Sequence, residues 1–164
     1  MHPDRQVRRA EASAPADAAT LGRLLYDFNT EFDSETDPAD VLAERFARLL
    51  GLDAVLALLA EGPDGAEGFA FLTLRPAVWF DGPVAQLEEL YVVPALRDAG
   101  IGTALLDLAR SLVRERGAPE MHINVDAIDT DTRRFYERHG FVNIEPGTDY
   151  RMLCYIGPTD RTPR

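Results

Sequence analysis

The chain has 164 residues, of which 46% are hydrophobic and 27% are charged, a balance typical of a folded globular protein and not of a disordered one. Its 17 basic and 28 acidic residues give a formal net charge of −11, which repels nucleic-acid phosphates and anionic lipid surfaces. We therefore expect neither nucleic acid nor a membrane as a partner. The same field would concentrate a cationic molecule such as an amine near the protein.

The single cysteine, Cys154, excludes a disulfide within the chain, and no cysteine–histidine cluster has the spacing of a zinc site. We expect no metal and a reducing, cytoplasmic environment. Residues 1–19 are polar and lack an apolar signal core, and no later run reaches the roughly 18 apolar residues of a membrane span. We expect one domain over residues 1–157 and a disordered tail over 158–164. The sequence does not determine the oligomeric state, and a homodimer is possible.

The first half of the chain alternates between helical and strand-like patterns. Asp17 or Thr20 can cap a helix whose apolar residues recur on one face, and Pro38 and Gly51 are typical start and stop residues of a second helix. Two apolar runs separated by turn residues indicate a hairpin. The predicted elements are strand 6–12, a helix carrying Leu21, Leu24, Leu25 and Phe28, helix 38–50, strands 55–60 and 68–74, a turn at 79–83 and strand 84–93.

The second half is dominated by one amphipathic helix. Its apolar positions, 101, 104, 105, 108, 109, 112 and 113, have helical spacing, and Gly117 ends the run. The pattern then predicts strand 121–125, helix 131–139 with Gly140 as its cap, and closing strands 141–144 and 151–156.

A glycine-containing loop joins the strand ending at Val93 to the long helix. Helix N-termini present unpaired N–H groups and the positive end of the helix dipole, and glycines let an anion approach the backbone. A Walker loop would need a lysine before its final Ser/Thr, and a dinucleotide fingerprint would need a small residue where Leu105 stands. We therefore expect a phosphate site of another type, formed by Arg97, Asp98, Ala99, Gly100, Ile101, Gly102 and Thr103.

The spacing of Arg97, Gly100 and Gly102 resembles the Arg/Gln-x-x-Gly-x-Gly/Ala loop of the GNAT family of N-acetyltransferases. Residues 87–94 look like the strand that precedes this loop, and residues 135–141 resemble the family's Phe-Tyr-Glu-x-x-Gly-Phe signature. The resemblance implies an α/β (α+β) acyl-CoA N-acyltransferase fold with about four helices. Its mixed, mostly antiparallel sheet would be splayed between the strand ending at Val93 and strand 121–125.

The resemblance also implies an activity: transfer of an acetyl group from acetyl-CoA to a primary amine, by direct attack in a ternary complex. The loop would hold the pyrophosphate of CoA, and the pantetheine arm would pair with the backbone of Tyr91, Val92 and Val93. Tyr136 would serve as the proton donor to the CoA sulfur. Asp129 stands where the family commonly has an asparagine at the cofactor.

An attacking amine must lose a proton, and Glu88 and Glu89 are the candidate bases. As neighbours on a regular strand they are expected to point to opposite faces, so that at most one faces the site. The resemblance to polyamine-type acetyltransferases favours Glu88, and spacing alone does not exclude Glu89.

The acceptor is expected to meet acidic and aromatic residues of the variable segments, which suit a cation. A polyamine, an aminoglycoside or a similar small amine is favoured over a peptide amine. Two other interpretations remain: a GNAT-like module that binds CoA or a regulatory ligand without turnover, and a non-enzymatic interaction domain whose glycines are only turns. The predicted acceptor-binding residues are Glu31, Trp79, Phe80 and Asn124.

Overall fold

A computed structural model describes residues 4–159 and divides the chain into two compact units, Met1–Ile123 and Asn124–Arg164, each of which is described by itself. The second unit contains one helix, α4 (Thr130–Arg138), within its described residues. The first contains β1 (Gln6–Arg9), α1 (Pro15–Glu31), α2 (Ala39–Leu50), β2 (Val55–Gly62), β3 (Gly65–Arg75), β4 (Val84–Val92), a 3-10 turn (Pro94–Leu96), α3 (Ile101–Glu115) and β5 (Met121–Ile123).

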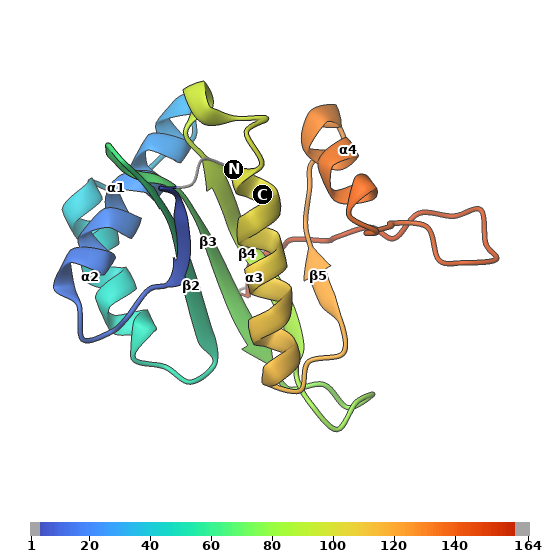
Figure 1. The fold of residues 1–164 in the computed structure, drawn as a ribbon. Coiled ribbons are helices and arrows are strands. Elements are labelled where there is room, and N and C mark those ends of the chain that lie inside the picture. Colours follow the sequence, from blue (N-terminus) through green and yellow to red (C-terminus); the bar gives the residue numbers. More distant parts are fainter. Residues whose placement is uncertain (1–3, 160–164) are drawn as a thin grey trace. The chain divides into compact units, whose positions relative to one another are not determined.

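The five strands form one sheet in the order β1-β2-β3-β4-β5, and the first four are antiparallel neighbours (Figure 1). β5 pairs with β4 in parallel, through Ala85↔Met121, Gln86↔His122 and Leu87↔Ile123. The predicted mixed, mostly antiparallel sheet is confirmed, and the described residues contain four α-helices, as predicted.

Helices cover both faces of this sheet. α1 and α2 lie on one face, where Leu24, Phe46 and Phe69 belong to a buried cluster, and α3 lies on the other (Figure 1). α1 and α2 approach closely at Gly22, since a Cβ there would lie 2.6 Å from the backbone of both Ala39 and Ala43. On α3 the predicted apolar positions 101, 105, 109 and 113 are buried, positions 104, 108 and 112 are partly buried, and Leu106, which was not predicted, is buried as well.

An ion-pair network joins β1, α1 and β2. Both terminal nitrogens of Arg8 donate to the buried Asp17 carboxylate at 2.8 Å, and Arg8 Nε donates to Glu61 at 2.8 Å. Hydrogen bonds from Arg8 hold the pKa of Asp17 below its usual value, against the effect of burial. The charges of a buried pair are satisfied in this way, and α1 is fixed over the sheet edge.

Several boundaries differ from prediction. α1 begins at Pro15 with Ala14 as its N-cap, so the prediction that Asp17 or Thr20 caps it is wrong. β3 begins at Gly65, three residues before the predicted start, and β5 ends at Ile123, two residues before the predicted end. The first strand ends at Arg9 and not at residue 12.

The predicted closing strands 141–144 and 151–156 are wrong: in the described residues after β5 there is one isolated bridge, Ile144↔Arg151, and no strand. Their apolar composition favours strands, but strands need paired neighbours, and Leu153 and Tyr155 are 71% and 89% exposed.

The prediction of one domain over 1–157 stays a prediction. Residues 160–164 of the predicted tail lie outside the described residues. In the part of the chain that the structure describes, no helix combines the length and apolarity needed to cross a membrane.

Candidate active site

The loop between β4 and α3 is shaped by two residues with left-handed backbones. Asp98 has φ 61° and Gly100 has φ 82°, and between them the chain turns from the extended Arg97 into α3 at Ile101. Glycine adopts this conformation without strain, and aspartate is among the few other residues that adopt it at modest cost.

The loop leaves the N-terminus of α3 accessible at Gly100. Gly100 is the N-cap residue, and its carbonyl accepts the first helical hydrogen bond, from Ala104 N at 3.0 Å. The N–H groups of the first turn have no acceptor within the helix, and they carry the positive end of its dipole. A Cβ built on Gly100 would meet no atom within 4 Å. Of the seven residues predicted to bind phosphate, Arg97 to Gly100 lie in the loop and Ile101 to Thr103 form the first turn of α3, where Ile101 is buried. Phosphate binding by this segment stays a prediction.

The Arg97 side chain is held by three neighbours. Its two terminal nitrogens each lie 2.7 Å from an oxygen of Glu31, and Nε donates to the Val92 carbonyl at 3.1 Å. Its guanidinium carbon lies 5.9 Å from the centre of the Tyr91 ring. The structure thus brings Glu31, predicted to bind the acceptor, into contact with Arg97, predicted to bind the cofactor.

Tyr91 forms the floor of this cluster. Its ring is stacked on Phe28 of α1, with centroids 5.0 Å apart, and it is 5% exposed. Burial raises the pKa of its hydroxyl, and the carboxylates of Glu31 and Asp27 raise it further, while Arg97 acts in the opposite direction. The hydroxyl therefore stays protonated and lies in a region of negative potential.

The expectation that Glu88 and Glu89 point to opposite faces is wrong, because β4 has a bulge between them. Phe71 pairs with Glu89 and Leu72 pairs with Leu87, which leaves Glu88 as the extra residue. Thr73, on the same face of β3 as Phe71, donates to Glu88 Oε1 at 2.5 Å. Both carboxylates therefore lie on the side of the sheet that α1 and α2 partly cover.

The two carboxylates differ in environment. Glu88 is exposed, whereas Glu89 is half-buried. Burial raises the pKa of Glu89 from 4.5 to about 7, and repulsion from Glu88 adds to the effect. A carboxylate that titrates near neutral pH can accept a proton from a bound amine and release it again. The favoured sequence candidate was Glu88; the property expected of a base lies at Glu89.

The β4–β5 pairing ends where this site begins. Leu87↔Ile123 is the last pair, so β4 continues from Glu88 to Val92 without β5 beside it. This stretch offers a strand edge to an extended ligand. At Val93 the N–H donates to Glu67 O and the carbonyl accepts from Leu96 N, both at 2.9 Å. Both backbone groups of Val93 are therefore already hydrogen-bonded within the protein, which disfavours the predicted pairing of Val93 with pantetheine.

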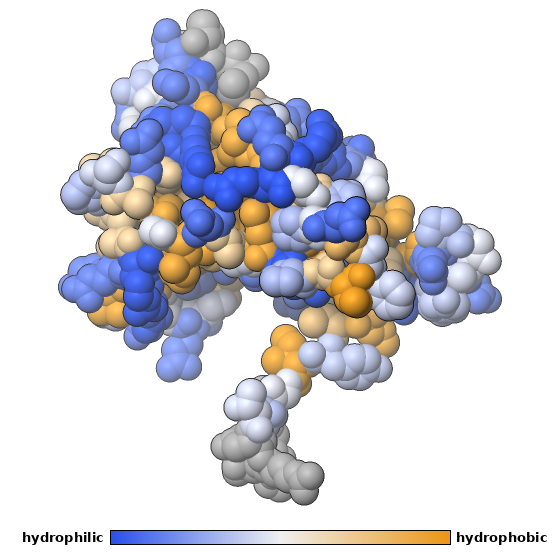
Figure 2. Space-filling model, turned by 90° about the horizontal axis from the view of Figure 1, so that it is seen from below, coloured by the Kyte–Doolittle hydropathy of each residue, from blue (hydrophilic) through white to orange (hydrophobic). Residues whose placement is uncertain are grey.

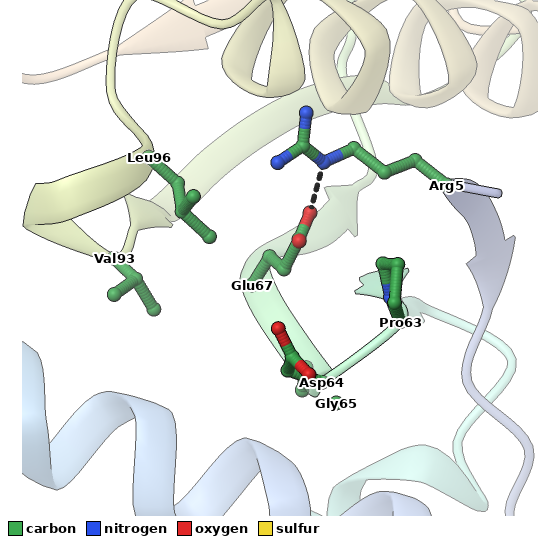
Figure 3. Close-up of a pocket in the computed structure, with 8 residues that line it drawn as sticks. Arg5, Pro63, Asp64, Gly65, Glu67, Val93 and Leu96 are labelled. Atoms are coloured by element: carbon green, nitrogen blue, oxygen red, sulfur yellow. Dashed lines mark hydrogen bonds and ion pairs between the residues drawn. The ribbon is translucent and has the colours of Figure 1, made fainter. Parts of the chain in front are cut away.

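A pocket of about 240 Å³ lies at the tip of the β2–β3 hairpin, between Arg5 and Leu96 (Figure 3). Inside it Arg5 Nε donates to the Glu67 carboxylate at 2.6 Å. Sequence reasoning did not find this pocket, since it depends on β1 reaching the hairpin. The pocket adjoins the segment that leads into the loop, through Val93 and Leu96.

The other predicted acceptor residues of the first unit lie away from Glu31. Trp79 and Phe80 precede β4, whereas Glu31 is bonded to Arg97 beyond the other end of that strand. Nine residues at about 3.3 Å each separate the two ends by roughly 30 Å, too far for one small amine to touch both. Trp79 is 86% exposed. An exposed hydrophobic residue is not unusual on this surface, because Figure 2 shows other hydrophobic residues between hydrophilic ones.

Three predicted site residues belong to the second unit. Asn124 is exposed and follows β5 instead of lying in it. Asp129 caps α4 by accepting from Thr132 N at 3.1 Å. Tyr136 is 8% exposed, and its ring packs edge-on against those of Phe135 and Phe141. The cap gives Asp129 a structural role that the sequence pattern did not indicate.

Among the described residues no group of three or more His, Cys, Asp or Glu side chains could hold a metal ion.

Comparisons with known proteins show which sequences this chain resembles. The sequence profile of the Acetyltransferase (GNAT) family matches residues 23–141. The chain is 30% identical to the aminoglycoside N(6')-acetyltransferase type 1 of Klebsiella aerogenes, over 93% of this chain and 95% of the relative. It is also 30% identical to the streptothricin acetyltransferase of Streptomyces lavendulae, over 79% of each chain.

Solved structures give the same result. A proposed acetyltransferase from Arthrobacter sp. FB24 is 49% identical, with a TM-score of 0.84 over 93% of this chain and 95% of the other. An aminoglycoside acetyltransferase from an uncultured soil metagenomic sample, solved with sisomicin, is 17% identical, with a TM-score of 0.75 over 96% of this chain and 97% of the other. The second likeness concerns the fold alone.

The raised pKa of Glu89 predicts a stability change with pH. Between its ordinary value of 4.5 and its folded value of about 7, the native state binds more protons than the unfolded state, so stability falls as pH rises through this window. Glu89→Gln removes this pH dependence. We therefore expect the change that it causes in the free energy of unfolding to be more favourable at pH 8 than at pH 4.5. The expected difference is on the order of 1–2 kcal/mol, a range that allows for partial solvent screening. Urea denaturation at the two pH values measures this difference.

The matched control is Glu44→Gln, which neutralises an exposed glutamate on α2 and should change stability equally at both pH values. An effect of Glu89→Gln that is the same at pH 4.5 and pH 8 would contradict a raised pKa.

Proposed function

The chain belongs to the Acetyltransferase (GNAT) family and is an N-acetyltransferase, and we propose that it transfers acetyl from acetyl-CoA directly to a primary amine of a small cationic acceptor. The observation that carries this proposal is the half-buried Glu89, whose pKa is about 7, on the part of β4 that leads into the phosphate-binding loop.

The chemistry requires such a group. A free alkylammonium has a pKa near 10.4, so that at pH 7 about one molecule in two thousand is neutral and able to attack a thioester. Glu89 would accept the proton from the bound ammonium, directly or through water. Because the pKa of Glu89 is near the working pH, a large fraction of Glu89 is deprotonated before the transfer. The carboxylate is also basic enough to accept the proton of the ammonium.

Cofactor binding would use the loop and the strand edge together. The first-turn N–H groups of α3 and the Arg97 guanidinium suit the pyrophosphate. The stretch of β4 without a β5 partner suits the pantetheine arm, which carries amide groups that can pair as a strand does. Acetyl-CoA would supply the activated acyl group, and the chain's residues would align it with the amine.

A cationic acceptor is supported by charge and by the relatives. Glu88 and Glu89 lie on one side of the sheet through the β4 bulge, and the chain as a whole has a net charge of −11. Closely spaced carboxylates favour a positively charged ligand. A relative covering 93% of this chain is named as an aminoglycoside N(6')-acetyltransferase, and we propose an aminoglycoside or polyamine as the acceptor class.

A screen of thiol release from acetyl-CoA with aminoglycosides, polyamines, amino acids and peptides tests this function. We expect turnover with at least one aminoglycoside or polyamine. With that acceptor, Glu89→Gln should lower kcat/KM by about 10²- to 10⁴-fold at pH 7, the usual contribution of a general base, while Glu88→Gln lowers it less than tenfold. The native kcat/KM should rise with pH and level off above about pH 7.

Two results would count against this proposal. Binding of CoA without thiol release to any cationic amine would reject the acceptor class. Equal losses in the Glu88 and Glu89 variants would reject Glu89 as the base.

We propose that Tyr136 stabilises the leaving thiolate. Its phenol has a reference pKa near 10, about 1.5 units above that of a simple thiol, so full transfer of its proton to sulfur is uphill by about 2 kcal/mol. Tyr136 would instead donate a hydrogen bond that strengthens as charge develops on sulfur. Tyr136→Phe should lower kcat by on the order of ten- to a thousandfold and leave the KM for acetyl-CoA nearly unchanged. Steady-state kinetics under conditions where chemistry limits the rate measure this. A folded variant with native kcat would assign Tyr136 to packing against Phe135 and Phe141.

A further inference from the structure

The guanidinium that the loop offers to a phosphate is already bonded to an acid. Both oxygens of Glu31, the last residue of α1, lie 2.7 Å from the terminal nitrogens of Arg97. This is the two-point geometry that a guanidinium also forms with phosphate. Neither the loop pattern nor the family profile assigns a role to Glu31.

We propose that Glu31 competes with the cofactor for Arg97: it holds the guanidinium over Tyr91 in the free protein, and the pyrophosphate of CoA displaces it. The inference rests on the proposed function for the identity of the phosphate ligand. Glu31 thereby lowers the affinity for CoA.

The exposure of the pair makes this exchange feasible. The side chains of Arg97 and Glu31 are 40% and 26% exposed, so water screens their attraction and can solvate the carboxylate once it is released. A pyrophosphate carries more charge than a carboxylate and would sit against the N–H groups at the start of α3 as well. The phosphate therefore outcompetes Glu31 when it is present.

The exchange requires Arg97 to give up another contact besides Glu31. Nε donates to the Val92 carbonyl at 3.1 Å, and the guanidinium carbon lies 5.9 Å from the centre of the Tyr91 ring. Because the guanidinium is a rigid plane, its terminal nitrogens cannot turn toward the loop while Nε keeps this bond. Rotation about the aliphatic bonds of Arg97 therefore redirects the whole guanidinium, and the bond to Val92 is exchanged together with the bonds to Glu31.

The charges around the cluster fix the sign of the effect. Asp27 lies one helical turn before Glu31, and both carboxylates act on the Tyr91 hydroxyl. When Arg97 turns to the phosphate, Glu31 loses its ion-pair partner and also faces a new anion, while Asp27 keeps its own partner, Arg23. Each of these changes opposes CoA binding, and neutralising Glu31 removes both.

Isothermal titration of the full chain with CoA and, separately, with pantetheine tests the proposal. Pantetheine lacks the pyrophosphate, so it reports on the strand edge without Arg97. Glu31→Gln should tighten CoA binding about three- to tenfold and change the Kd of pantetheine less than twofold. In an Arg97→Gln background, Glu31→Gln should tighten CoA binding less than it does in the native chain, because the shared guanidinium is gone and only the repulsion between Glu31 and the phosphate remains.

The control is Glu35→Gln, which removes the same charge from an exposed position four residues further along, and which should change CoA affinity less than twofold. Unchanged or weaker CoA binding in Glu31→Gln, with a native melting temperature, would overturn the inference while leaving the proposed function intact. Equal tightening of CoA and pantetheine would also overturn it. Absence of CoA binding by the native protein would instead reject the proposed function, and this inference with it.

Discussion

The bulge in β4 is the constraint on which the site depends. In a regular strand, Glu88 and Glu89 would face opposite sides of the sheet, and one carboxylate would point toward α3. Glu88 is the extra residue between the pairs Phe71↔Glu89 and Leu72↔Leu87. It shifts the alternation of β4 by one position, so that Glu88 and Glu89 lie on one side of the sheet while Leu87 stays paired with Leu72. The raised pKa of Glu89 follows from this arrangement, since it reflects both burial and the nearby charge of Glu88.

The same strand connects the other parts of the site. Beyond Glu89 it supplies Tyr91, whose ring supports Arg97, and Val92, whose carbonyl fixes Arg97 Nε. The backbone then turns into α3, whose first turn would face the phosphate in the proposed function. The proposed base, strand edge and phosphate loop thus belong to one continuous segment, which α1 contacts through Glu31.

The sequence predicted the features that local patterns determine. The apolar spacing of α3 and the glycines before it depend on neighbours in the chain, and both the helix and its loop were found. The family profile over residues 23–141 and the mixed sheet agree with the resemblance seen in the loop. Features that depend on distant partners were missed or misjudged. The β4 bulge arises from pairing with β3, and the Arg97–Glu31 contact requires α1 to end beside the loop. Strand 151–156 was predicted from composition, which does not reveal whether a neighbouring strand exists.

The most direct test of the account is to follow backbone amide chemical shifts during titration of the full chain with CoA. We expect the largest changes at residues 97–103 and in the β4 stretch from Glu88 to Val92, because those amides would face the pyrophosphate and the pantetheine arm. Amides of β1 and β2 should move little. Saturable binding that shifts β1 and β2 most, and leaves residues 97–103 unchanged, would contradict the assignment of this segment as the cofactor site.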